Sequence, residues 1–307
     1  MARAISNRRS SEGIPMHENP SSRWSERTAG DDVGCLSRFP APVIALHCSG
    51  ADGGQWRKLP GVLGPRYEVF TPSFIGCADI GPWTGERAFT LADEARAVIG
   101  LVDALAAPVH LVGHSYGGAV ALKVASARPS AIASVTLYEP SAFHLLRQVG
   151  ERGRSAHAEI EAIASAIGAG LVSGAYQSAA AQFVDYWNGA GAWAALRPAV
   201  RDALIRWLPK APFDFRALIE DTTSIGSYDR ISCPAHIIRG EYARGPSRLI
   251  AEILARTLPR TTLDVLPGAG HMGPVTHQSE VYTCIAGYIR AATHSGRPAD
   301  HVRSKAA

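Results

Sequence analysis

The sequence predicts an α/β fold, with a mostly parallel central sheet, helices on both faces and an inserted helical cap. Short β-branched runs alternate with helical stretches of about 10–16 residues, a rhythm typical of crossover connections between parallel strands. The alternation stops between residues 141 and 232, where helical patterns replace strand patterns. The chain has 307 residues, 46% of them apolar, which suffices for one large domain carrying a substantial insertion.

Six short apolar runs, most of them bounded by Pro or Gly, are expected to form the strands. They are rich in β-branched residues and lack the strict polar alternation of a half-exposed strand, which favours burial on both faces. In chain order they are PVIALHC at 42–48, YEVFTP at 67–72, PVHLVG at 108–113, ASVTLYEP at 133–140, AHIIRG at 235–240 and TTLDVLPG at 261–268.

Helices are expected between these strands. A first helix begins after Thr90, where Asp93 suits the first turn; its apolar face is formed by Leu91, Ala95, Val98, Val102 and Leu105. A small-residue helix follows the third strand and stops at Pro129. Further helices are expected at 247–257 and 277–292.

Three parts make up the expected domain organisation. Residues 1–38, rich in Ser, Arg, Gly and Asp, are expected to form a mostly disordered tail. Residues 39–140 and 233–307 are expected to form the α/β core, and residues 141–232 a helical cap. The cap is expected over the carboxyl ends of the strands, where open parallel sheets bind ligands.

Composition argues against several classes of function. The formal net charge is +4, from 31 Lys and Arg against 27 Asp and Glu, and no basic stripe with interleaved aromatics indicates a nucleic-acid partner. No apolar run is long enough to span a bilayer, and the N-terminus lacks a signal-peptide apolar stretch. The five cysteines are scattered without metal-ligand spacing, which favours free thiols, a reducing cytoplasmic compartment and no metal. The oligomeric state stays open.

The candidate nucleophile is Ser115, in GHSYGG at 113–118. This stretch fits G-x-S-x-G, with a predicted strand running into it and a predicted helix running out of it. Such a turn lifts the serine above the sheet edge, and glycines at 113 and 117 avoid clashes with the neighbouring helix and strand. The helix N-terminus behind Ser115 also favours developing negative charge.

The chain resembles capped α/β-hydrolases with a serine nucleophile, over about residues 40–292. The resemblance rests on LHCSGADGGQW after the first strand, GHSYGG, LYEP, and GAGHMGP at 268–274. In that family the catalytic residues follow the order nucleophile, acid, histidine. The resemblance therefore implies that His271 is the base that takes the proton of Ser115.

The acid of the implied triad stays open. The family usually carries Asp after the strand that here reads AHIIRG, but Ala243 occupies that position. Glu139, at the end of the strand that follows the nucleophile helix, is the favoured acid, because some family members carry their acid there. Glu241 is the alternative, and a Ser–His dyad oriented by water or a carbonyl is a third arrangement.

The resemblance also implies an oxyanion hole. One donor is the backbone N–H of Tyr116, directly after the nucleophile, and the other is assigned by position to Ser49. Cys48 stands where the family has Gly. As a competing nucleophile Cys48 is disfavoured, because it lies in no elbow and a small buried Cys is usually inert.

The expected function is cofactor-free serine hydrolysis of a small or medium carboxylic ester or related acyl compound, through an acyl-enzyme. The expected partner is a small-molecule substrate, in a pocket lined by Phe143, Tyr186, Trp187, Trp193 and Trp207. The same scaffold also hosts C–C bond hydrolases, lyases, perhydrolases and non-catalytic ligand receptors, which stay as alternatives.

Overall fold

All six expected strands form, and they pair in one parallel sheet. The computed structural model describes residues 41–77 and 80–295, so the tail expected at 1–38 lies outside the described residues. The strands are β1 (Ala41–Leu46), β2 (Tyr67–Phe70), β3 (Val109–His114), β4 (Ile132–Tyr138), β5 (Ala235–Gly240) and β6 (Thr261–Leu266). Their order is β2-β1-β3-β4-β5-β6, with every neighbouring pair parallel. The predicted fold class is confirmed.

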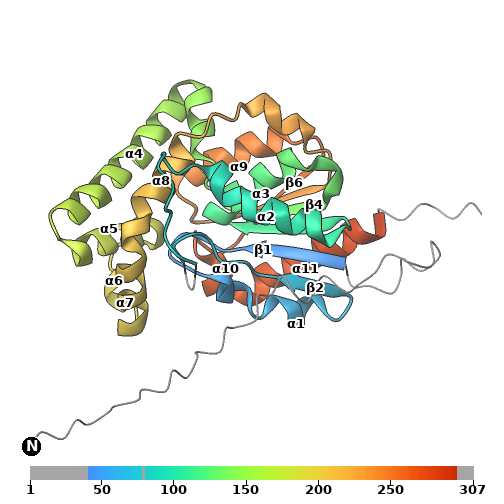
Figure 1. Cartoon of the computed structure of the whole chain (residues 1–307), viewed down its shortest axis with the longest axis horizontal. Coiled ribbons are helices and arrows are strands. Elements are labelled where there is room, and N and C mark those ends of the chain that lie inside the picture. Colours follow the sequence, from blue (N-terminus) through green and yellow to red (C-terminus); the bar gives the residue numbers. More distant parts are fainter. Residues whose placement is uncertain (1–40, 78–79, 296–307) are drawn as a thin grey trace, which may run out of the picture. The chain divides into compact units, whose positions relative to one another are not determined.

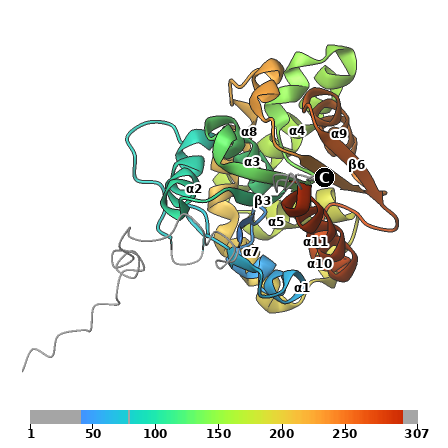
Figure 2. The same ribbon diagram turned by 90° about the vertical axis from the view of Figure 1, so that its right-hand side faces the viewer.

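Helices cover both faces of the sheet (Figure 2). On one face α2 (Leu91–Leu105), α3 (Tyr116–Ala127) and α9 (Gly245–Thr257) contribute to the larger apolar core. On the other, α1 (Leu59–Leu63) and α11 (Gln278–Ser295) contribute to a second core. Because both faces are covered, the central strands are buried on both sides, which explains their continuous apolar runs.

Between β4 and β5 the chain forms only helices and turns. Figure 1 shows its longer helices gathered to one side of the sheet, at the left of the view. Helix α4 packs against α5, α8 and α9, which ties the insertion to the core. The elements are η4 (Phe143–Gln148), α4 (Gly150–Val172), α5 (Tyr176–Asn188), α6 (Ala192–Ala195), α7 (Pro198–Trp207), η5 (Leu208–Lys210), α8 (Ala211–Ile219) and η6 (Ile225–Arg230).

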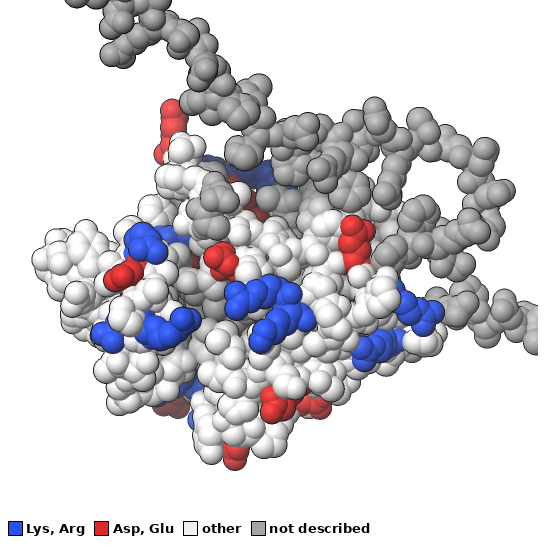
Figure 3. All heavy atoms as spheres, turned by 90° about the horizontal axis from the view of Figure 1, so that it is seen from below, with Lys and Arg blue, Asp and Glu red and all other residues white. Residues whose placement is uncertain are grey.

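Three short elements complete the fold: η2 (Gly53–Trp56), η3 (Pro129–Ala131) and α10 (Gly273–Thr276). On the face drawn in Figure 3, basic and acidic side chains lie interspersed rather than in a patch of one sign. None of the helices in the described ranges has both the length and the apolarity needed to cross a membrane.

The site is positioned by a reversal in strand order. Strands β1 and β3 are neighbours, but β1 connects outward to β2 on one side, whereas β3 connects to β4 on the other. The connections that follow β1 and β3 therefore run to opposite sides of the sheet from the carboxyl ends of these strands. Open α/β sheets bind their ligands at such a switch point.

Candidate active site

Ser115 occupies a sharp turn between β3 and α3. Its backbone is left-handed, with φ 54° and ψ −115°, a strained conformation for a residue with a Cβ. The turn is also tightly packed. A Cβ on Gly113 would lie 2.6 Å from the carbonyl oxygen of Gly117, and one on Gly117 would lie 2.5 Å from that of Leu46. Only glycine fits at both positions, which explains the spacing in GHSYGG.

A chain of two hydrogen bonds joins Ser115, His271 and Glu139. Oγ of Ser115 is 3.0 Å from Nε2 of His271, and Nδ1 of His271 is 2.8 Å from Oε2 of Glu139. A carboxylate only accepts, so Nδ1 carries the proton and Nε2 is free to accept from the serine hydroxyl. The three residues are 6%, 4% and 0% exposed, so the whole chain of contacts is shielded from water.

Glu139 lies directly after β4, and its backbone is also left-handed, with φ 41°. Its second oxygen, Oε1, accepts the N–H of Gly240 at 2.9 Å, so both carboxylate oxygens have donors. Glu241 instead accepts the N–H of Gly268 at 2.8 Å, and its side chain is exposed. The structure therefore brings Glu139, and not Glu241, into contact with His271.

The loop that carries His271 is held from two sides. Tyr138 Oη donates to the carbonyl of Gly270 at 2.8 Å, and Nε2 of His114 donates to the carbonyl of His271 at 2.9 Å. The Gln55 amide donates to Nδ1 of His114 at 3.0 Å, which fixes its neutral tautomer. Burial holds the pKa of His114 well below its ordinary value, in keeping with an uncharged ring.

The two predicted oxyanion donors, Ser49 and Tyr116, lie in the loop after β1 and at the start of α3. Among the described residues, neither the N–H of Ser49 nor that of Tyr116 has a hydrogen-bond acceptor. The loop after β1 is fixed by the N–H of Cys48, which donates to Oε1 of Gln55 at 3.0 Å. Gly117 N–H donates to the carbonyl of His47 at 3.1 Å and ties α3 to the same loop.

Neither His47 nor Cys48 is suited to proton transfer or nucleophilic attack. His47 donates from Nδ1 to the carbonyl of Cys48 at 2.8 Å and accepts the N–H of Phe74 at Nε2, so it braces the loop. Burial lowers the pKa of His47 to about 4. Burial also raises the pKa of the Cys48 thiol to about 12, which keeps it protonated and unreactive.

Comparison with known proteins identifies the family. A sequence profile described as the alpha/beta hydrolase family matches residues 43–282. This chain belongs to the α/β-hydrolase family. Lipase LipV of Mycobacterium tuberculosis is 34% identical over 103 residues, which cover 33% of this chain and 38% of that protein.

Solved structures of other α/β-hydrolases share the fold. A thermophilic esterase from Thermogutta terrifontis has a TM-score of 0.63 at 21% identity, over 83% of this chain and 91% of the esterase. The α/β-hydrolase MGS-M2, from a Medee basin deep-sea metagenome library, has a TM-score of 0.69 at 14% identity, over 86% of this chain and 92% of that one. At such low identity the likeness establishes the fold alone.

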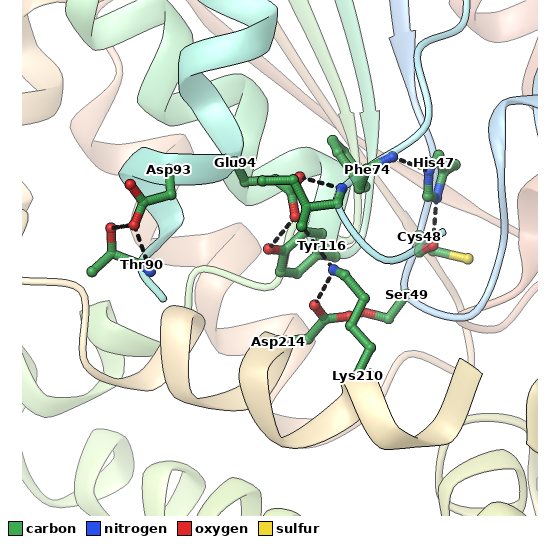
Figure 4. A network of polar contacts seen from close by, with 11 residues as sticks. His47, Cys48, Ser49, Phe74, Thr90, Asp93, Glu94, Tyr116, Lys210 and Asp214 are labelled. Carbon is green, nitrogen blue, oxygen red and sulfur yellow. Dashed lines mark hydrogen bonds and ion pairs between the residues drawn. The ribbon is translucent and has the colours of Figure 1, made fainter. Parts of the chain in front are cut away.

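In this α/β-hydrolase a mostly buried polar network joins Ser49 and Tyr116, the two predicted oxyanion donors, to the helical insertion (Figure 4). Ser49 Oγ donates to Oδ2 of Asp214 at 2.7 Å. Lys210 pairs with Oδ1 of Asp214 and lies 3.3 Å from Oε2 of Glu94. The same Glu94 oxygen accepts the hydroxyl of Tyr116 at 3.0 Å. One lysine from the insertion thus links the loop after β1 to the start of α3.

Burial is the largest influence on the charges of this network. It raises the pKa of the Glu94 and Asp214 carboxyl groups, although Lys210 acts in the opposite direction on both. Burial alone would lower the pKa of Lys210, but the two carboxylates outweigh it and the pKa of Lys210 lies above its ordinary value. The buried charges of Lys210, Glu94 and Asp214 are therefore stable only while the ammonium group remains paired with the two carboxylates.

The five predicted pocket aromatics occupy different places. Trp187 stacks on His271, Tyr186 packs edge-on against Trp187, and Phe143 lies parallel to Trp187 with ring centroids 6.3 Å apart. Trp207 packs against Phe183 and beside Gly50, and Trp193 lies under the guanidinium of Arg201. A hollow of about 730 Å³ borders this group, with Trp187, His271, Tyr242 and Arg244 among its walls.

Three neighbours of the site have no clear signature in the sequence. Ser141 places its hydroxyl 3.0 Å from Oγ of Ser115. Asp214, which pairs with Lys210, accepts the hydroxyl of Ser49 in the loop after β1. Lys210 and Asp214 are four residues apart on helical elements, a spacing that indicates an ion pair. That spacing does not indicate that the pair reaches Ser49, because this contact joins segments 165 residues apart.

Proposed function

We propose that this chain is a serine hydrolase that cleaves a small or medium carboxylic ester, or a related acyl compound, through an acyl-enzyme. The observation that carries the proposal is the buried chain of hydrogen bonds from Ser115 through His271 to Glu139. A serine hydroxyl is a weak nucleophile at neutral pH, and an adjacent imidazole oriented by a carboxylate is the arrangement that activates it.

The first half of the reaction forms the acyl-enzyme. His271 accepts the proton of Ser115 at Nε2 while Oγ attacks the ester carbonyl carbon, and the carbonyl oxygen becomes an oxyanion. The N–H groups of Ser49 and Tyr116 donate to that oxyanion. When the tetrahedral intermediate collapses, His271 gives its proton to the departing alkoxide, and the alcohol leaves.

The second half releases the acid. Water loses a proton to His271 as its oxygen attacks the acyl carbonyl carbon. When the second tetrahedral intermediate collapses, its bond to Oγ of Ser115 breaks, His271 returns the proton to Oγ, and the acid leaves. Throughout, Glu139 stabilises the imidazolium through its contact with Nδ1 and holds the ring in place. Gly240 N–H fixes the other carboxylate oxygen, which keeps Glu139 from turning away.

Aromatic side chains near the site support an acyl substrate with a hydrocarbon group. Trp187 is buried against His271 and Phe143 lies parallel to Trp187, and burial of apolar substrate surface against such rings contributes about 25 cal/mol per Å². The four cysteines in the described ranges are free thiols, which supports the reducing, cytoplasmic setting that we propose for the enzyme.

The test is the Ser115→Ala variant assayed with p-nitrophenyl acyl esters and a fluorophosphonate probe. We expect loss of both steady-state turnover and labelling. The matched control is Ser126→Ala, since Ser126 lies about 16 Å along the same helix and its buried hydroxyl has no partner among the described residues. Equal labelling of wild type and Ser115→Ala would remove Ser115 from the mechanism. Binding without turnover in the wild type would favour a receptor.

A further inference from the structure

A second cluster of polar side chains lies where α11 packs against β5 and β6. His236 comes from β5, Asp264 from β6 and Cys284 from α11. Nε2 of His236 is 2.8 Å from Oδ2 of Asp264. Sγ of Cys284 is 3.9 Å from that nitrogen and 3.8 Å from that oxygen. Three atoms capable of binding a metal therefore lie within 4.8 Å of one another.

The cluster is not arranged as a proton relay. In a relay the nucleophile and the acid contact opposite nitrogens of the imidazole, as Ser115 and Glu139 do at His271. Here Cys284 and Asp264 both contact Nε2, while Nδ1 of His236 is buried with no hydrogen-bond partner in the described ranges. The ring cannot pass a proton from one group to the other, and the three atoms instead face a common point.

We propose that His236, Asp264 and Cys284 bind a Zn²⁺ ion. Imidazole nitrogen, carboxylate oxygen and thiolate sulfur are the ligands that zinc prefers, and three of them with one water complete a tetrahedral site. Zinc bonds of about 2.0–2.3 Å place tetrahedral ligand atoms roughly 3.3–3.6 Å apart. The three separations here, 2.8, 3.8 and 3.9 Å, require shifts of only about half an ångström.

The surroundings suit an ion that enters from solvent. The side chain of Asp264 is 52% exposed and Cys284 is partly exposed, so water and a metal ion can reach the common point. His236 is buried, and its ring stacks on Tyr288 with centroids 4.5 Å apart, which fixes its orientation.

This site is distinct from the proposed active site. His236 lies four residues before Gly240, whose N–H binds Glu139, and thus about 13 Å away along β5. The ligands are 28 and 20 residues apart and come from three elements, so no short sequence motif marks them. Loss of the metal is therefore expected to leave the hydrolysis assigned to Ser115 in place.

The experiment uses the full-length chain, stripped with a chelator and titrated with Co²⁺, followed by competition with Zn²⁺. In the wild type we expect an intense near-ultraviolet band from thiolate-to-cobalt charge transfer at one equivalent. Cys284→Ser should abolish that band. Asp264→Asn should weaken cobalt affinity by more than about tenfold, because even outer-shell partners typically cost 10–100-fold.

Cys77→Ser is the control, since it removes a thiol elsewhere in the described chain and should keep the band. Circular dichroism shows whether each variant is folded. If Cys284→Ser does not fold, the cobalt affinity of Asp264→Asn tests the proposal alone. Absence of a charge-transfer band in the wild type, or the same band and affinity in Asp264→Asn or a folded Cys284→Ser, would overturn the proposal. The cluster would then be a His–Asp hydrogen bond beside a thiol.

Discussion

The imidazole of His271 lies against the indole of Trp187, with ring centroids 4.2 Å apart and planes inclined by 25°. Trp187 belongs to α5 of the helical insertion, whereas His271 follows β6 of the core. Among the described residues, the walls of the neighbouring hollow include both rings but not Ser115. Trp187 therefore contacts the imidazole on which the mechanism depends and also forms part of the wall of that hollow.

Trp187→Ala should change acyl-length preference. Removal of the indole joins the hollow to the space beside Ser115, so kcat/KM for longer acyl esters should rise by at least about tenfold relative to the acetyl ester. The measurement is a series of p-nitrophenyl esters of increasing chain length. Trp193→Ala, which alters another tryptophan of the insertion, serves as control. An unchanged ratio in Trp187→Ala would show that the indole does not limit the acyl group.

Glu139→Gln should lower kcat by up to about 10⁴-fold, because an amide stabilises neither the required tautomer nor the imidazolium. Glu241→Gln is the matched control. The amide oxygen of the new glutamine can still accept the N–H of Gly268, and residue 241 does not contact His271. Steady-state kinetics on one ester measures both variants. The opposite ranking would transfer the role of acid to Glu241.

Lys210→Met should destabilise the fold by about 3–5 kcal/mol, since Glu94 and Asp214 would remain buried without their cation. Urea unfolding measures the loss. Arg216→Met, which breaks an exposed pair between α8 and Glu220 directly after it, should cost less than about 1 kcal/mol. The folded Lys210→Met fraction should also react more slowly with fluorophosphonate, because Asp214 no longer holds Ser49 firmly. Equal stability of the two variants would contradict this account of the network.

Acid should destabilise the protein between about pH 6.5 and pH 4. Burial lowers the pKa of His47, His110 and His144 to about 4, whereas in the unfolded chain a histidine titrates near 6.5. In that window the unfolded state binds protons that the folded state does not, so the free energy of unfolding falls as pH falls. Above about pH 6.5 this contribution is fully present.

The three histidines with a pKa near 4 contribute up to about 4 kcal/mol per pH unit to the slope, and His114, whose pKa burial also lowers, adds to it. Urea unfolding at several pH values from neutral down to about 5 measures the slope. His144→Gln should lower it by up to about 1.4 kcal/mol per pH unit, since it removes one titrating group. A free energy of unfolding that is flat over this range would show that these histidines are protonated in the folded state.

Short sequence patterns predicted the strands and the turn that carries Ser115. The alternation of strands and helices predicted the sheet, and the glycines around Ser115 predicted a turn that only small residues can form. The sheet and the turn depend on periodicity and turn chemistry, which neighbouring residues determine. His271, by contrast, was predicted from the resemblance of its loop, GAGHMGP, to the family.

Tertiary structure decided which distant groups meet. Glu139 and Glu241 both lie at strand ends, and only the packing of β4 beside β5 shows that Glu139 reaches His271, 132 residues away. The contact of Asp214 with Ser49, and the convergence of His236, Asp264 and Cys284, likewise join separate elements. Such contacts depend on how whole helices and strands pack, and a one-dimensional pattern carries no record of that packing.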